Sequence, residues 1–135
     1  MYLQNKLLVA FCVSLSLSVL PGCFSGSSVP VGPVSGVVTK DGQPLADATV
    51  TFFPESGRPS IGMTDESGRY ELLFTESVNG AMVGLHKVNI SFGGPPPPGE
   101  MNREKKNKRV LPPQSVDWPD MVKVTESYNT LDFDL

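Results

Sequence analysis

The sequence is poor in the residues on which most catalytic and metal sites are built. It contains one histidine, His86, and two cysteines, Cys12 and Cys23, and it has no Gly-x-Ser-x-Gly segment typical of a nucleophile elbow. No Cys-x-x-Cys or His-rich spacing is present, which argues against zinc. The segment Asp65-Glu66-Ser67-Gly68 lacks the further oxygen ligands of a calcium loop. We therefore expect no metal, no cofactor and no enzymatic activity.

Charge and length are also limited, and this excludes other classes. A chain of 135 residues holds at most one ordinary domain, and its net charge of -3 is too small to argue for a nucleic-acid partner. Neither cysteine lies beyond residue 33, so no disulfide stabilises the later region, whose stability must come from apolar burial. Glycine and proline, at 13 each, are plentiful and indicate many turns.

The N-terminal segment has the pattern of a signal peptide. Residues 1–6 carry one Lys and no acid, and the 14 residues from Leu7 to Leu20 are free of charge. A membrane-spanning helix needs about 20 apolar residues, so this segment is too short for a permanent anchor.

Leu20-Pro21-Gly22-Cys23 follows directly and resembles a bacterial lipobox. The resemblance implies cleavage after residue 22 and diacylglycerol on Cys23, which would become the acylated amino terminus. Two or more acyl chains give stable anchoring. The alternative is an ordinary secretory signal with a cysteine placed by chance. Phe24, rather than Asp, follows the cysteine, which by analogy favours the outer membrane where a cell has two.

Residues 23–33 are interpreted as the lipidated cysteine and a flexible tether of Ser, Gly and Pro. Beyond it, residues 34–135 alternate in the way a half-buried sheet demands. Expected strands cover 34–39, 48–52, 60–64, 70–74, 84–92, 121–124 and 130–135. About seven short strands with no convincing helix predict an all-β, antiparallel Greek-key sandwich. The residues expected to face inward are Ala48, Val50, Phe52, Tyr70, Leu72, Phe74, His86, Val88, Ile90, Phe92, Leu131, Phe133 and Leu135.

Several turn motifs in this region resemble a known family. The stretches from Gly36 to Phe52, from Thr64 to Tyr70 and from Gly84 to Ile90 look like a carboxypeptidase regulatory-like domain of the transthyretin-like (prealbumin-like) class. The ending from Asn129 to Leu135 resembles the closing strand of small bacterial lipoproteins built on that domain. The resemblance implies the sandwich but no activity, because this fold class hosts binding, spacing and catalytic members.

Two residues of the predicted domain, His86 and Trp118, are candidates for a functional role. The phase of His86 places it on the inner face or at the end of its strand, where it is expected to be structural and to fill a position usually held by Tyr in the family. Trp118 could stack on a sugar, or it could cap the end of the core, which is the commoner role of a lone Trp beside a proline.

The connection over residues 93–114 combines Pro95–Pro98 with a cluster of basic residues: Arg103, Lys105, Lys106, Lys108 and Arg109. Without the leader the chain has 10 basic and 14 acidic residues, and outside 103–109 it has 5 basic and 13 acidic ones. This basic segment on an acidic body could contact anionic lipid head groups or an acidic surface polymer. The alternative is a solvated loop with solubilising charge.

The sequence thus predicts a lipid-anchored, non-enzymatic protein of the cell envelope that acts as a structural or protein-interaction module. The alternative is a carbohydrate- or peptidoglycan-binding lipoprotein that uses Trp118. The expected partners are the membrane, through the lipid on Cys23, and an envelope protein or polysaccharide.

Overall fold

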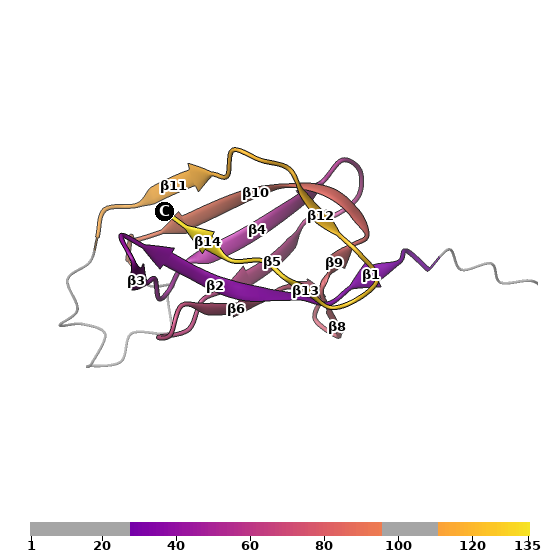
Figure 1. The fold of residues 1–135 in the computed structure, drawn as a ribbon, viewed down its shortest axis with the longest axis horizontal. Coiled ribbons are helices and arrows are strands. Elements are labelled where there is room, and N and C mark those ends of the chain that lie inside the picture. The colour runs from indigo at the N-terminus through magenta and orange to yellow at the C-terminus, as the bar shows by residue number, and fades with distance from the viewer. Residues whose placement is uncertain (1–27, 96–110) are drawn as a thin grey trace, which may run out of the picture.

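The fold is a β-sandwich, as the alternation predicts. A computed structural model describes residues 28–95 and 111–135, and within these ranges every regular element is a strand. Two sheets face each other, with the smaller one in front of the larger one in the view of Figure 1. None of the described residues forms a helix that could cross a bilayer.

The larger sheet has seven strands in the order β11-β10-β4-β5-β7-β8, with β12 also paired to β10. All of its ladders are antiparallel, and the longest joins β10 to β4. β10 returns beside β4 on the side away from β5, so neighbours in the sheet are not neighbours in sequence. The strands are β4 (Thr49–Pro54), β5 (Ser60–Met63), β7 (Leu73–Thr75), β8 (Val78–Asn79), β10 (Gly84–Phe92), β11 (Gln114–Asp117) and β12 (Val122–Val124).

The smaller sheet has five strands arranged around β2. They are β2 (Val34–Lys40), β3 (Gln43–Pro44), β6 (Arg69–Glu71), β13 (Asn129–Thr130) and β14 (Phe133–Asp134). β13 and β14 run parallel to β2, which corrects the expectation of a purely antiparallel sandwich. The reason is that the chain reverses after β12 and enters the small sheet from the same end as β2 (Figure 1).

A third, two-stranded sheet lies where the chain enters the domain. β1 (Val31–Gly32) pairs with β9 (Ala81–Met82). The expectation of a tether through residue 33 is therefore wrong at its C-terminal end. A side chain at Gly32 would meet the Thr125 carbonyl oxygen at 1.8 Å, so the backbones approach closely there.

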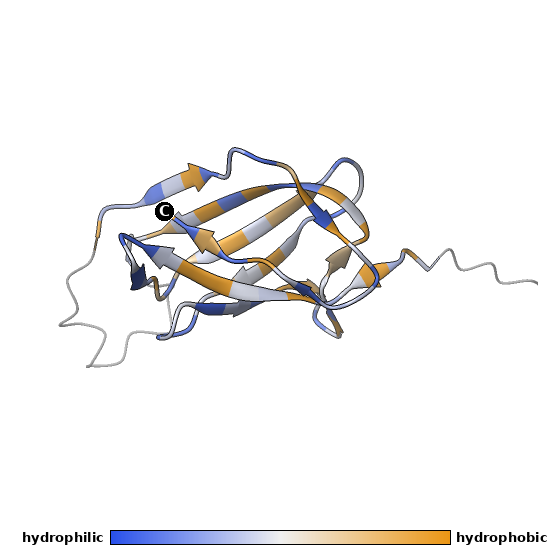
Figure 2. Ribbon diagram, viewed as in Figure 1, coloured by the Kyte–Doolittle hydropathy of each residue, from blue (hydrophilic) through white to orange (hydrophobic). Residues whose placement is uncertain are grey.

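The core lies between the two large sheets and confirms most of the predicted inward positions. Figure 2 shows apolar positions along β2, β4 and β10, separated by polar ones. Phe74, Leu131 and Leu135 are only partly buried. The buried apolar residues are Val34, Val38, Ala48, Val50, Phe52, Tyr70, Leu72, Ala81, Val88, Ile90, Phe92, Val124 and Phe133.

The predicted strand over 70–74 is divided between the two sheets. β6 pairs with β2, whereas β7 pairs with β5, and Leu72 between them is fully buried. Its N–H donates to the Val34 carbonyl in the small sheet, and its own carbonyl accepts from Gly80 N–H. The chain therefore crosses the sandwich at Leu72 without leaving a backbone group unpaired there.

Two turns have the predicted chemistry. Asp41 and Gly42 both have positive φ, 52° and 75°, as a two-residue hairpin between β2 and β3 requires. In the second turn Asp65 Oδ1 accepts hydrogen bonds from the Ser67 and Arg69 amides at 2.8 and 3.0 Å, and Gly68 has a φ of 75°.

Candidate functional site

Several residues predicted to be functional lie outside the part of the chain that the structure describes. These are the leader 1–22, the lipidation residue Cys23, and the basic residues Arg103, Lys105, Lys106, Lys108 and Arg109. The structure does describe the segments that flank them. It therefore shows at which end of the sandwich each of these regions is attached.

The two flanks lie at opposite ends of the sandwich. β1, which follows the predicted tether, is at the right-hand end in Figure 1, beside β8, β9 and β13. The connection that carries the basic residues leaves near the end of β10 and returns before β11, at the left-hand end (Figure 1). Its base is closed by a 2.7 Å hydrogen bond from Gly94 N–H to the Leu111 carbonyl.

Trp118 lies just after β11 and packs on the core. Its backbone N–H donates to the Val88 carbonyl at 2.8 Å, and its ring meets the Phe133 ring edge-on, with 4.9 Å between centroids. The side chain is partly buried against the core cluster. These contacts give Trp118 the role of a cap on the end of the core.

His86 lies on the inner face of β10 and is fully buried. Its Nε2 is 2.7 Å from the Met82 carbonyl, so Nε2 carries the proton and donates it there. The imidazole is tilted against Phe52 at 5.7 Å, and among the described residues Nδ1 has no hydrogen-bond partner. The ring thus ties β9 to the start of β10, which is a structural task.

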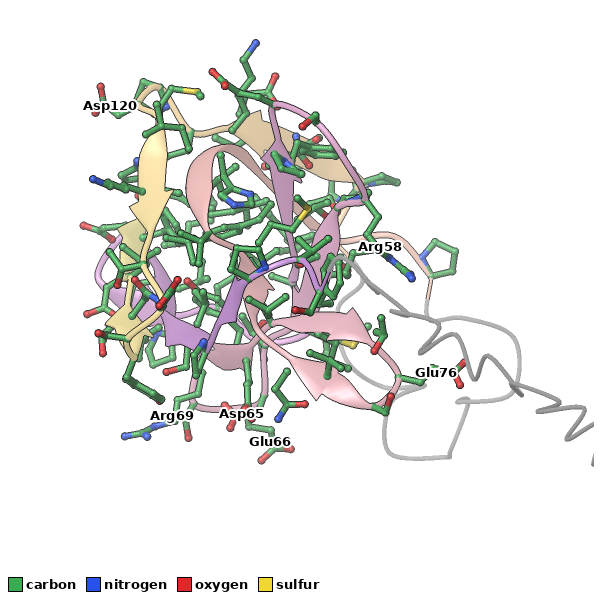
Figure 3. The ribbon with its side chains drawn as sticks, turned by 90° about the vertical axis from the view of Figure 1, so that its right-hand side faces the viewer. Arg58, Asp65, Glu66, Arg69, Glu76 and Asp120 are labelled. Atoms are coloured by element: carbon green, nitrogen blue, oxygen red, sulfur yellow. The ribbon has the colours of Figure 1, made fainter. Side chains whose placement is uncertain are left out.

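Charged side chains of the described residues point outward from separate elements. Figure 3, which looks at the end where β1 enters, shows Arg58, Glu76 and Asp120 at separate places on the surface and Asp65, Glu66 and Arg69 along one turn. Within residues 28–95 and 111–135, no three His, Cys, Asp or Glu side chains gather as metal ligands would.

A buried amide that the sequence reading missed fixes the chain near β1. The Asn129 side chain donates to the carbonyls of Pro33, Thr125 and Ser127 at 3.0, 3.0 and 2.6 Å. Its Oδ1 accepts from the amide and hydroxyl of Thr125 at 2.9 and 3.0 Å. It therefore joins the turn before β13 to the start of β2. The motif Ser127-Tyr128-Asn129 carries no pattern that would predict this.

A second missed pair lies in the small sheet. Tyr70 is buried and donates its hydroxyl proton to the Leu131 carbonyl at 2.6 Å. Burial first, and the nearby Asp132 carboxylate second, raise the pKa of Tyr70 well above its ordinary value. Asp132 itself accepts from the Val37 amide at 2.8 Å. Tyr70 thus holds the C-terminal segment to β6, and Asp132 holds it to β2.

The outer face of the large sheet carries exposed apolar side chains, which the sequence reading also missed. Phe53 on β4, Ile61 and Met63 on β5, and Leu73 on β7 are each about half exposed. Their neighbours in the chain point into the core, so the alternation that predicted the core also places these four outside. The signal that predicts them is the same alternation, applied to the outward positions.

Comparison with known proteins adds little. No family model matches the chain, and no curated protein does. A DUF3823 family protein from Parabacteroides merdae is 14% identical with a TM-score of 0.45, over 79% of this chain and 46% of that one. A 9R-lipoxygenase from Cyanothece is 14% identical with a TM-score of 0.38, over 76% of this chain and 16% of that one. The chain spans less than half of either protein, and likeness at this level says nothing of function.

Proposed function

We propose that this chain is a lipid-anchored protein of the cell envelope whose β-sandwich is a non-enzymatic structural or protein-interaction module. The observation that carries the proposal is Leu20-Pro21-Gly22-Cys23 at the end of an apolar segment, with β1 beginning only eight positions after Cys23. A domain that starts so soon after an acylated cysteine would be held close to the bilayer.

The sandwich is proposed to belong to the carboxypeptidase regulatory-like, transthyretin-like class. The three stretches that resemble this class, residues 36–52, 64–70 and 84–90, contain in turn the Asp-Gly hairpin after β2, the Asp65–Gly68 turn and most of the long strand β10. Members of such a class serve varied purposes, so the assignment concerns architecture.

A module without catalysis suits the chemistry of the described part. The single histidine is buried and bonded to a backbone carbonyl, which is a structural arrangement. Recognition would then fall to surfaces, with an envelope protein or polysaccharide as the partner. The basic residues between 103 and 109, opposed to an otherwise acidic body, favour an anionic partner.

The test is Cys23→Ser, with Cys12→Ser as the matched control because Cys12 lies in the segment to be removed. We expect mass spectrometry to find acyl groups on Cys23 of the mature wild type and of the Cys12 variant. The Cys23 variant should remain unprocessed or appear in the soluble fraction, since it has no thiol to receive the lipid. Mature, membrane-bound protein from the Cys23 variant, or a wild type without acyl groups, would refute the anchoring.

A further inference from the structure

The outer face of the large sheet has an apolar half that residues 28–95 and 111–135 leave uncovered. Ile61 pairs directly with Leu73 on β7, and Met63 lies two positions further along β5 on the same face. Phe53 lies on the neighbouring strand, two positions from Thr51, which is the partner of Ile61. The exposed fractions are 46% for Phe53, 49% for Ile61, 56% for Met63 and 48% for Leu73. We call these four residues the apolar face.

The other half of the same sheet surface is mostly polar. Asn89 on β10 donates to the Ser115 hydroxyl and to the Asp117 carboxylate at 2.8 and 2.6 Å. Lys87 precedes it on the same side of β10, directly opposite Phe53. On β10, Leu85 is also apolar and 45% exposed, so the exposed apolar residues are concentrated on the β4-β5-β7 half and extend to one end of β10.

The four residues of the apolar face carry no charge themselves, and charged groups lie only at its borders: Lys87 opposite Phe53, and Glu71, which accepts a hydrogen bond from Asn79, the strand partner of Leu73. The outward positions of β4, β5 and β7 are held by Thr, Phe, Ile, Met and Leu only, although the chain outside 103–109 has an excess of acid. An uncharged surface on an acidic body is the part that can approach an anionic bilayer at the lowest electrostatic cost. Single exposed apolar residues are ordinary, but a contiguous set marks an interaction surface.

The short tether determines what this face can reach. Val31 follows Cys23 by eight positions, and an extended chain covers at most about 3.6 Å per residue, so β1 begins within roughly 29 Å of the anchor. β10, which runs the length of the sheet, has nine residues and is about 30 Å long. The anchor can therefore hold the whole domain within reach of the head groups.

We propose that the apolar face rests on the lipid bilayer, so that the sandwich lies on its side with the β4-β5-β7 half of the large sheet toward the head groups. This inference rests on the proposed anchoring at Cys23. The anchor supplies a high local concentration of membrane, so a small apolar surface suffices to set the orientation.

A second copy of the chain is the less suitable occupant. Four half-exposed side chains form a patch no larger than the largest apolar patch of an ordinary monomer, which is about 300–600 Å². A stable dimer buries about 800 Å² on each partner. The apolar face alone falls well short of that area, whereas an anchored protein needs no such area to meet its own membrane.

The test uses the full, acylated protein in vesicles of phosphatidylethanolamine and the anionic lipid phosphatidylglycerol. A polarity-sensitive dye is attached at Ile61→Cys, or at Met63→Cys as a second position, since Cys12 is removed with the leader and the Cys23 thiol is blocked by the lipid. Arg69→Cys, exposed on β6 of the opposite sheet, is the matched control. Unchanged Trp118 emission shows that each variant is folded.

We expect the dye at position 61 or 63 to shift to the blue in vesicles and to be quenched by doxyl-labelled lipid several-fold more than the dye at 69. Replacing both Phe53 and Leu73 by Thr should reduce that difference. Equal quenching at the three positions, in protein that carries acyl groups and floats with vesicles, would overturn the orientation and leave the anchoring intact. A blue shift without lipid quenching would point to a protein cover and overturn it too. Protein without acyl groups would refute both proposals.

Discussion

The two sheets of the sandwich are stabilised in different ways. In the large sheet, β10 forms six residue pairs with β4 and four with β11, so the backbone ladder around β10 is long. In the small sheet, β13 and β14 contribute only two pairs each to β2. A two-residue strand gives little ladder stability, so the small sheet needs other contacts to retain its C-terminal edge.

Those contacts are polar side chains bonded to the backbone or to each other. Asp132 binds the Val37 amide, and Tyr70 binds the Leu131 carbonyl. Thr39 donates its hydroxyl proton to Asp134 Oδ1 at 2.7 Å. The comparison teaches that ladder length and side-chain cross-links substitute for one another, and that mutating a polar residue should matter more in the small sheet than in the large one.

The largest expected effect is that of Phe133→Ala, because Phe133 joins the two sheets. Its ring lies 6.1 Å from that of Phe52 across the core, 6.2 Å from Tyr70 and 4.9 Å from Trp118. We expect the free energy of unfolding to fall by about 3–5 kcal/mol, measured by urea denaturation with Trp118 fluorescence.

Phe53→Ala is the matched control, since this phenylalanine points outward and is half exposed. Its loss should be about 1 kcal/mol or less, because little area is removed from the interior. If the two variants lost the same stability, β14 would not contribute to the core in the way described.

Asn129→Ala should have the next largest effect. The change removes the side-chain partner of the Thr125 and Ser127 carbonyls and of the Thr125 amide, whereas the Pro33 carbonyl keeps the backbone N–H of residue 129. We expect a loss of about 2–3 kcal/mol in the same urea assay, since buried polar groups left unpaired are costly.

Asn89→Ala tests the other side of the comparison, because this amide bonds only to surface side chains of the large sheet. Its loss should stay within about 0.5 kcal/mol, as for an ordinary surface substitution. A large loss of stability at Asn89 together with a small loss at Asn129 would mean that side-chain hydrogen bonds matter more in the large sheet than in the small one.

Much of the fold could be predicted because period-2 alternation is a local signal. The inward positions of β4 and β10 follow from it directly, and so does the burial of His86. The Asp-Gly and Asp65–Gly68 turns were predicted for the same reason, since their chemistry depends on adjacent residues.

The features that the sequence did not predict depend on contacts between residues far apart in the chain. The parallel pairing of β13 with β2 joins segments almost a hundred residues apart, and the crossing at Leu72 depends on which sheet receives each half of the strand. Asn129 looks like an ordinary polar loop residue until its five bonds are seen together. β1 was missed because Val31-Gly32 is too short to have a period.

Tyr70→Phe removes a single oxygen atom, so it separates the effect of the hydrogen bond from that of the aromatic packing. The variant retains the ring against Phe133 and loses only the bond to Leu131, so near pH 8 we expect a loss of about 1 kcal/mol.

Burial and Asp132 raise the pKa of Tyr70 in the folded protein, whereas the unfolded residue titrates near its ordinary value of about 10. The folded state therefore keeps a proton that the unfolded state releases at high pH. This stability is fully present below about pH 10 and declines as the pH rises above it, by up to about 1.4 kcal/mol per pH unit. Urea denaturation at pH 8 and at pH 11 should show the wild type losing more stability than Tyr70→Phe over that interval. Parallel losses in the two proteins would mean that the Tyr70 hydroxyl is open to solvent and does not link the C-terminal segment to β6.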